Sequence, residues 1–161
     1  MLIYAQPADL TAPHADGSPP WLPTVPANAG QLIRRASQMI TKATRLDRYY
    51  TYPIPVGGTI PTSAPAGTDT GKPSDPLVSQ AFNDACCEQV VFWTTAGIDP
   101  VAGVAGQPLI VTAQAAPAGG SVTYQTSRSA EWLEAAVNEL CEAAVDTLRN
   151  AGLRTLVPEV Y

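Results

Sequence analysis

The residues of this chain that could take part in nucleophilic or metal chemistry are three cysteines and one histidine. Cys86 and Cys87 are adjacent, Cys141 stands alone, and His14 lies in a stretch rich in proline and glycine. Adjacent cysteines rarely bridge each other because the disulfide geometry is strained, and no CxxC spacing indicates a zinc site. We therefore predict buried, reduced thiols, with a redox or nucleophilic role as the alternative.

Acid–base and phosphate chemistry have equally little support in the sequence. Asp84 and Glu88 stand four residues apart, but no partner base or metal ligand accompanies them, and we interpret both as surface residues. A catalytic cysteine would need a general base beside it, and His14 belongs to no recognisable signature with either thiol. The motifs GxSxG, GxxxxGK[ST], GxGxxG and HExxH are absent from the sequence. We therefore expect that the chain is not an enzyme, has no catalytic residue, and binds neither a metal nor a cofactor.

Composition points to a subunit of a larger assembly. The chain has 161 residues, which suits one domain, and 45% of them are apolar, close to the ordinary level. Only 14% are charged, against about 25% in typical domains, so the surface carries little of the charge that keeps monomers apart. The net charge of −5 and the lack of a basic cluster larger than Arg34-Arg35 disfavour tight binding to nucleic-acid phosphates. We expect no signal peptide and no membrane span.

Three helices are predicted to form the body of the domain. Residues 28–46 have the helical period and can be capped by Asn28. Residues 75–96 follow the N-cap Asp75 and stop at Gly97. Residues 128–151 keep the helical period for about five turns. Ser127 or Ser129 is the expected N-cap, and Gly152 ends the helix. The inward stripes are Ala29, Leu32, Ile33, Ala36, Ile40 and Ala43 in the first helix; Val78, Ala81, Phe82, Ala85, Cys86, Gln89, Phe92/Trp93 and Ala96 in the second; and Leu133, Ala136, Val137, Leu140, Cys141, Ala144, Leu148 and Ala151 in the third.

Proline-rich segments connect and precede these helices. Prolines exclude regular structure from most of residues 1–27, apart from a short helical turn predicted to begin at Pro7. Trp21 and Leu22 are expected to pin this segment onto the body. Residues 57–74 are mostly Gly, Pro, Ser and Thr, a long loop that is either functional or disordered.

A β-hairpin is predicted at about 109–125. Leu109-Ile110-Val111-Thr112 and the run from Ser121 to Gln125 are β-prone, and turn residues separate them. A lone hairpin is marginal in water, so it needs a partner sheet or a neighbouring subunit. The expected fold is thus mainly α: a small bundle of three main helices with a β-hairpin. We assign 1–152 to this domain and 153–161 to an extended C-terminal tail.

The C-terminal tail is unusually apolar for a chain end. Its residues are Leu153, Arg154, Thr155, Leu156, Val157, Pro158, Glu159, Val160 and Tyr161. Such a strip can add to a sheet edge or fill a groove on a partner, although Pro158 restricts it to an edge position. The alternative is that the tail folds back on its own subunit and buries Leu153 and Leu156.

The order of several segments resembles one family of viral proteins. The segments are "YAQPADL", "PANAGQLIRRASQMITKAT", "DPLVSQAFNDACCEQVVFWTTAGIDP", "GGSVTYQT" and "LCEAAVDTLRNAGL". Together they resemble the head-to-tail adaptor (connector) proteins of tailed phages, in particular those of phages infecting actinobacteria. The resemblance covers most of the chain, whereas the 57–74 loop and the N-terminal proline segment are longer than the family pattern.

The resemblance implies a structural protein of the virion neck, made in the host cytoplasm. Members form a ring of about 12 copies, a closed head-to-tail arrangement, beneath the portal protein. The ring joins the capsid to the tail, contacts a downstream neck or stopper protein, and lets DNA pass through its lumen without specific binding. The resemblance also implies that the tail 153–161 docks on the portal. A ring of about 12 chains at −5 each carries about −60, which repels DNA phosphates from its lumen.

Two sets of residues are candidates for contacts between subunits. They are the basic residues Arg34, Arg35, Lys42 and Arg45, and the hairpin residues Ile110, Val111, Val122 and Tyr124. The alternatives to an adaptor are another neck component, such as a stopper or tail terminator, and a non-viral helical protein-binding module. Stoppers and tail terminators are usually richer in β-structure than the three predicted helices allow.

Overall fold

The computed structural model describes residues 2–13, 17–45, 47, 73–103 and 129–153. Within these ranges the chain is mainly α-helical and contains no strand. Its elements are the 3-10 helix η1 (Pro7–Leu10) and the α-helices α1 (Ala29–Ala43), α2 (Pro76–Ala96), α3 (Ala130–Asn138) and α4 (Glu142–Asn150). The predicted hairpin at 109–125 and all but the last two residues of the 57–74 loop lie outside the described residues.

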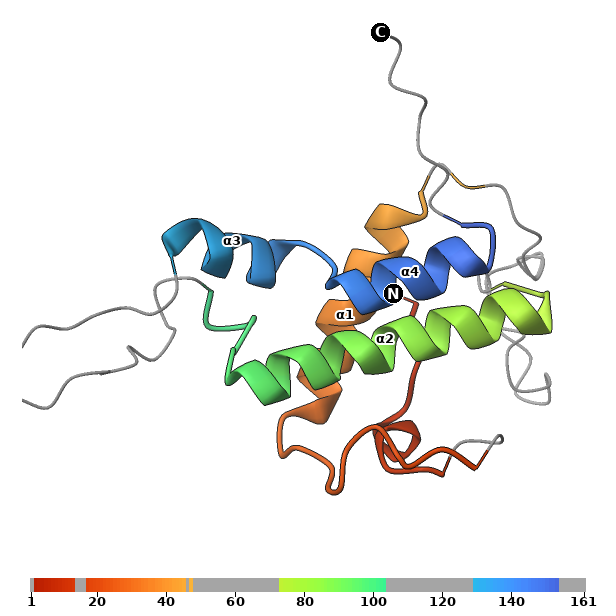
Figure 1. Ribbon diagram of the computed structural model, residues 1–161, viewed down its shortest axis with the longest axis horizontal. Helices are drawn as coiled ribbons and strands as arrows, with labels where there is room; N and C mark the ends of the chain where they lie inside the picture. Colours follow the sequence, from red (N-terminus) through yellow and green to blue (C-terminus); the bar gives the residue numbers. More distant parts are fainter. Residues whose placement is uncertain (1, 14–16, 46, 48–72, 104–128, 154–161) are drawn as a thin grey trace, which may run out of the picture.

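The long helix α2 lies at the centre of the fold. It begins as predicted, with the Asp75 side chain accepting a hydrogen bond from the Leu77 N–H at 2.8 Å and Pro76 in the first turn. It ends as predicted at Gly97, whose φ of 63° is left-handed and therefore suits glycine. In Figure 1, α4 runs antiparallel beside α2, and α1 crosses behind both helices. α2 is therefore covered on two sides.

α1 buries the face that its sequence predicts, but its predicted cap does not form. Leu32, Ile33 and Ile40 are buried. Asn28 makes no side-chain capping bond, because its backbone (φ −100°, ψ 16°) departs from the extended conformation of an N-cap. Its carbonyl oxygen instead accepts the backbone N–H groups of Gln31 and Leu32.

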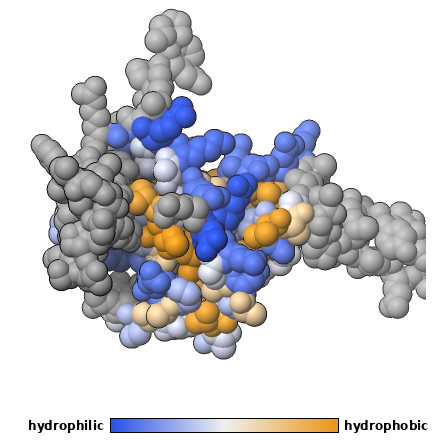
Figure 2. Space-filling view, turned by 180° about the vertical axis from the view of Figure 1, so that it is seen from behind, coloured by the Kyte–Doolittle hydropathy of each residue, from blue (hydrophilic) through white to orange (hydrophobic). Residues whose placement is uncertain are grey.

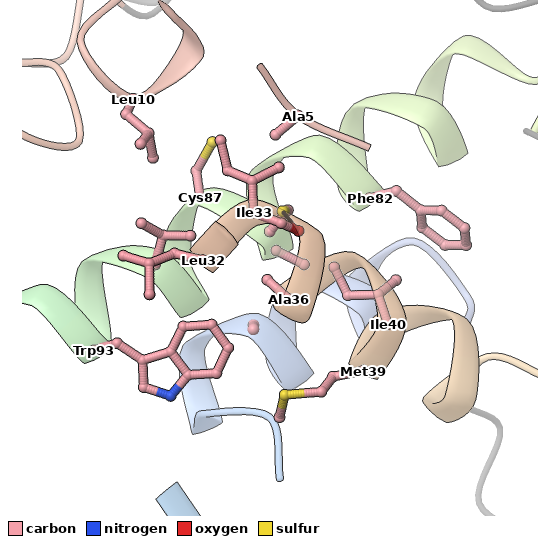
Figure 3. Packing of buried hydrophobic residues seen from close by; sticks show 14 of the residues in the cluster. Ala5, Leu10, Leu32, Ile33, Ala36, Met39, Ile40, Phe82, Cys87 and Trp93 are labelled. Carbon is pink, nitrogen blue, oxygen red and sulfur yellow. Dashed lines mark hydrogen bonds between the residues drawn. The ribbon is translucent and has the colours of Figure 1, made fainter. Parts of the chain in front are cut away.

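α1 and α2 cross through small side chains at the centre of the core. Ser37 and Cys86 are fully buried, with Oγ and Sγ 3.7 Å apart, and the same sulfur lies 3.7 Å from the Ile33 carbonyl oxygen. Small residues at such a crossing let helix axes approach closely. Figure 3 shows the larger residues around the crossing, with Phe82 near one end of the contact and Trp93 near the other.

The N-terminal segment closes one side of this core. η1 forms at the predicted prolyl turn, and Leu10 within it is fully buried. Leu22 is also buried and donates its backbone N–H to the Leu10 carbonyl oxygen at 2.8 Å. Trp21 packs against the cluster, so the prediction that Trp21 and Leu22 pin the segment is confirmed.

The prediction of one continuous helix over 128–151 is wrong. Ser129 caps α3 as expected, but the helix ends at Asn138, and α4 starts only at Glu142. Glu139 and Cys141 have extended backbone conformations, with ψ of 155° and 157°. Leu140 lies between them, so a three-residue break interrupts the predicted five turns.

Hydrogen bonds from other helices account for the break. In a continuous helix the carbonyls of Ala136 and Val137 would accept the N–H groups of residues 140 and 141. Instead, the Trp93 indole N–H donates to the Ala136 carbonyl at 2.7 Å, and the Arg35 guanidinium donates to the Val137 carbonyl at 3.4 Å. The Cys141 N–H donates to Gln89 Oε1 at 2.6 Å. Tertiary partners thus replace the helical ones.

We predict that Gln89→Leu destabilises the fold by about 1–3 kcal/mol, because it leaves the half-buried Cys141 N–H without its acceptor. Urea unfolding of the variant and the parent chain measures this difference. Gln80→Leu is the matched control, since Gln80 is exposed on the same helix, and it should change stability by less than about 0.5 kcal/mol. Equal effects of the two substitutions would contradict the role assigned to Gln89.

Candidate functional site

A groove of about 530 Å³ lies between α2, α3 and the start of α4. Its walls are mainly apolar and aromatic, and its polar groups are three glutamates. The residues that line it are Trp21, Glu88, Val91, Phe92, Trp132, Ala135, Ala136, Glu139, Leu140, Cys141, Glu142 and Ala143. The break between α3 and α4 supplies Glu139, Leu140 and Cys141, so the groove depends on that interruption of the helix.

Aromatic rings form much of the groove wall. Phe92 of α2 and Trp132 of α3 have ring centroids 6.2 Å apart, and Trp132 is 38% exposed. Trp21 adds a third ring from the N-terminal segment. The sequence predicted contacts with the body for Trp21 and Phe92 but placed Trp132 on no inward stripe, because its position facing α2 follows from the tertiary structure.

Glu88 is not a simple surface residue, so its interpretation as one is wrong. It is half-buried between α2 and α4, and the Thr147 hydroxyl donates to its carboxylate, with distances of 3.0 and 2.9 Å to the two oxygens. Burial raises the pKa of Glu88, and the nearby Asp84 and Asp146 carboxylates raise it further, against the opposing effect of the Thr147 hydrogen bond. Asp84 is half-buried as well and accepts a hydrogen bond from Gln80 at 2.8 Å.

The cysteines are free thiols in the structure, and two of them are buried as predicted. Cys86 and Cys87 are 0% exposed, whereas Cys141 is half-buried in the groove wall. Burial raises the pKa of Cys86 to about 12 and also raises the pKa values of Cys87 and Cys141. A raised pKa keeps a thiol protonated at neutral pH, and the thiolate is the nucleophile. The surroundings therefore favour unreactive thiols.

The basic residues proposed as interface candidates have different surroundings. Arg34, Lys42 and Arg45 are exposed. Arg35 is half-buried, and its guanidinium donates to the Val137 carbonyl and, at 3.2 Å, to Asn138 Oδ1. Arg35 thus joins α1 to the end of α3 within one subunit. The hairpin candidates Ile110, Val111, Val122 and Tyr124 lie outside the described residues.

The first residue of the predicted tail belongs to the core of the subunit. Leu153 is 4% exposed, and its N–H donates to the Leu148 carbonyl at 2.9 Å, next to the left-handed Gly152 (φ 76°). This 6→1 bond is typical of a helix end with glycine at C′. Residues 154–161 of the tail lie outside the described residues.

In the described part of the chain, no group of three or more His, Cys, Asp or Glu residues could hold a metal ion. Likewise, none of the helices described has both the length and the apolar character needed to cross a bilayer.

Comparison with known proteins identifies no relative of this chain. No family model matches the chain, and neither a curated protein nor a solved structure matches it. Function is therefore inferred from the residues and their geometry.

We predict that Cys86 and Cys87 resist alkylation in the native protein at pH 8, because both thiols are buried and their pKa values are raised. Iodoacetamide labelling followed by peptide mass spectrometry, with and without denaturant, measures this protection. The half-buried Cys141 in the same sample is the internal comparison and should react faster. Rapid native labelling of Cys86 would contradict the prediction and support a reactive thiol.

We predict that Glu88 makes the fold less stable as pH rises. Because its folded-state pKa is raised, the folded state holds this proton more tightly than the unfolded state, and the resulting stabilisation is lost as pH rises above about 4.5 through the raised pKa. Glu88→Gln keeps an acceptor for Thr147 but cannot ionise. Its stability relative to the parent should therefore increase from pH 4 to pH 7, as followed by thermal unfolding.

The exposed Glu134 on α3 offers the matched substitution for this experiment. Glu134→Gln should show a smaller pH-dependent difference from the parent chain. A Glu88→Gln variant whose relative stability decreased towards pH 7 would contradict the raised pKa.

Proposed function

We propose that this chain is a structural protein of the phage neck, a head-to-tail adaptor that forms a ring of about 12 copies, closed by head-to-tail contacts, beneath the portal. In this proposal it joins capsid to tail, contacts a downstream neck or stopper protein and lets DNA pass through its lumen. It acts without catalysis or a cofactor, and its place is the neck of the virion.

The observation that carries the proposal is the order of the segments and the elements they form. η1 forms within "YAQPADL", α1 within "PANAGQLIRRASQMITKAT", α2 within "DPLVSQAFNDACCEQVVFWTTAGIDP" and α4 within "LCEAAVDTLRNAGL". The described part is mainly helical, which agrees with an adaptor better than with a β-rich stopper or tail terminator. The finer features, a hairpin at 109–125 and an extended tail, remain parts of the proposal.

Charge supports the same proposal. The chain has few charged residues, 14%, and a net charge of −5. A surface with few charged residues suits a subunit that buries part of that surface against its neighbours. A ring with a large negative charge would repel DNA phosphates and so keep the lumen free of tight binding.

The tail is proposed to dock on the portal through the residues that follow Leu153. Leu153 is part of the intramolecular core, so the docking segment consists of residues 154–161. Leu156, Val157 and Val160 would supply apolar contacts to a sheet edge or a groove.

The groove favours a second candidate function, a helical protein-binding module. Its aromatic wall and its volume of about 530 Å³ are compatible with binding a segment of another protein. Such a module would neither form rings nor attach to a portal, and that difference separates the two candidates.

We predict that a chain ending at Leu153 folds normally but no longer attaches to the portal, because the truncation keeps the Leu153 packing and removes only the docking segment. Negative-stain microscopy of each chain mixed with the portal of the same virus tests this, with circular dichroism as the check of folding. Glu159→Gln, which leaves every apolar residue of the tail in place, is the matched control and should attach. Normal attachment of the truncated chain would overturn the role of the tail, and no attachment of the full chain would overturn the adaptor proposal.

A further inference from the structure

The basic side chains of the described part of the chain are concentrated on and just after α1. Apart from Arg149, the described Lys and Arg residues lie on α1 or in the turn that follows it. The acidic residues of α3, α4 and the break between them are Glu131, Glu134, Glu139, Glu142 and Asp146. Arg149 pairs with Asp146 at 3.4 Å inside α4. The α1 region is therefore mainly basic and the α3–α4 region mainly acidic, and the two regions meet at a cleft lined by Lys42 and Glu139.

The groove combines this acidity with aromatic walls. Glu139 and Glu142 are both exposed, and both line it. Trp132 and Phe92 present ring surfaces to the same space. Aromatic faces attract cations, apolar walls accept the methylene stems of long basic side chains, and carboxylates bind guanidinium through paired hydrogen bonds. The side chain that satisfies all three conditions is arginine.

Among the described residues, two arginines are available for such a site on another copy. Arg34 and Arg45 are exposed, and neither has an ion-pair partner among the described residues. Arg35 is held by Val137 and Asn138 of its own chain. Lys42 lines a cleft with Asn138 and Glu139 of its own chain, so of the basic residues described in and just after α1, Arg34 and Arg45 remain as the donors.

α1, which carries Arg34, lines no part of the groove. α1 passes behind α2 and α4 in Figure 1. Figure 2 shows the molecule from behind, and hydrophilic residues cover much of the middle of that face. Arg34 lies in the first half of α1 and Arg45 in the turn after its end, so they can engage a neighbour at two points.

We propose that the groove between α2, α3 and α4 receives Arg34 and Arg45 from the α1 region of a neighbouring copy of this chain. Glu139 and Glu142 bind the guanidinium groups, and the rings of Phe92 and Trp132 pack against the arginine stems. In this proposal the donors of one copy enter the groove of the next, a heterologous contact that repeats from copy to copy, as a ring requires. The inference rests on the proposed function for its expectation that copies assemble, and it names the contact that joins them.

Charge reversal and mixing test the contact directly. Sedimentation velocity of the full-length chain should show self-association that weakens as salt rises. R34E/R45E alone and E139K/E142K alone should each weaken self-association at least about tenfold, because like charges then face each other across the contact. An equimolar mixture of the two variants should restore it, since each copy then meets a neighbour of opposite charge at both of its surfaces.

The control carries the same charge change away from the groove. E131K/E134K alters two exposed glutamates of α3 that do not line it, and this variant should associate like the parent chain. Restoration in the mixture also shows that both variants are folded. The proposal is overturned if the parent chain stays monomeric at every salt concentration, if the mixture remains dissociated, or if E131K/E134K abolishes association as strongly as E139K/E142K.

Portal attachment of the same variants, measured by negative-stain microscopy, separates this contact from the adaptor proposal. Salt-sensitive association with the expected rescue, but no attachment to the portal, would remove the adaptor function and keep the contact. Portal-attached rings that persist unchanged in E139K/E142K would keep the adaptor function and remove the contact.

Discussion

Two hydrogen bonds from buried side chains of α2 determine how the C-terminal third of the chain is built. Gln89 Oε1 accepts the Cys141 N–H at 2.6 Å, and the Trp93 indole donates to the Ala136 carbonyl at 2.7 Å. Both side chains are fully buried, where an unpaired polar group is costly. Each finds its partner on backbone that a continuous helix would have used internally. The following helix is therefore interrupted where its backbone bonds to Gln89 Oε1 and the Trp93 indole, although the buried Gln89 Nε2 has no hydrogen-bond partner among the described residues.

The interruption creates the surface to which we assign function. It turns Leu140 and Cys141 towards the space beside α2 and places Glu139 and Glu142 next to that space. Arg35 of α1 holds the other side of the same junction through Val137 and Asn138. The groove is thus supported from two helices. Its exposed acidic residues belong to the α3–α4 junction and the exposed arginines to α1 and the turn after it, so donor and acceptor are different patches, as head-to-tail assembly needs.

Much of the groove could not be predicted from the sequence, for identifiable reasons. The helical period predicts inward positions for Phe92 and Cys141, and Trp21 is predicted to pin the N-terminal segment, but neither argument shows which apolar residues leave an open groove. Glu88 looked like a surface residue because its partner Thr147 is 59 positions away. Trp132 stands outside the periodic stripe, and its contact with Phe92 exists only after α3 is placed against α2.

The sequence by itself determined the helical class, the positions of η1, α1 and α2, the cap at Asp75 and the stops at Gly97 and Gly152. These features depend on periodicity, capping side chains and the left-handed freedom of glycine, all of which act within a few residues. Only the tertiary structure decided that residues 128–151 form two helices and that Arg35 bonds within its own subunit. It also decided that Leu153 belongs to the core. Those outcomes depend on hydrogen-bond and packing partners far away in the chain, and local preference contains no information about them.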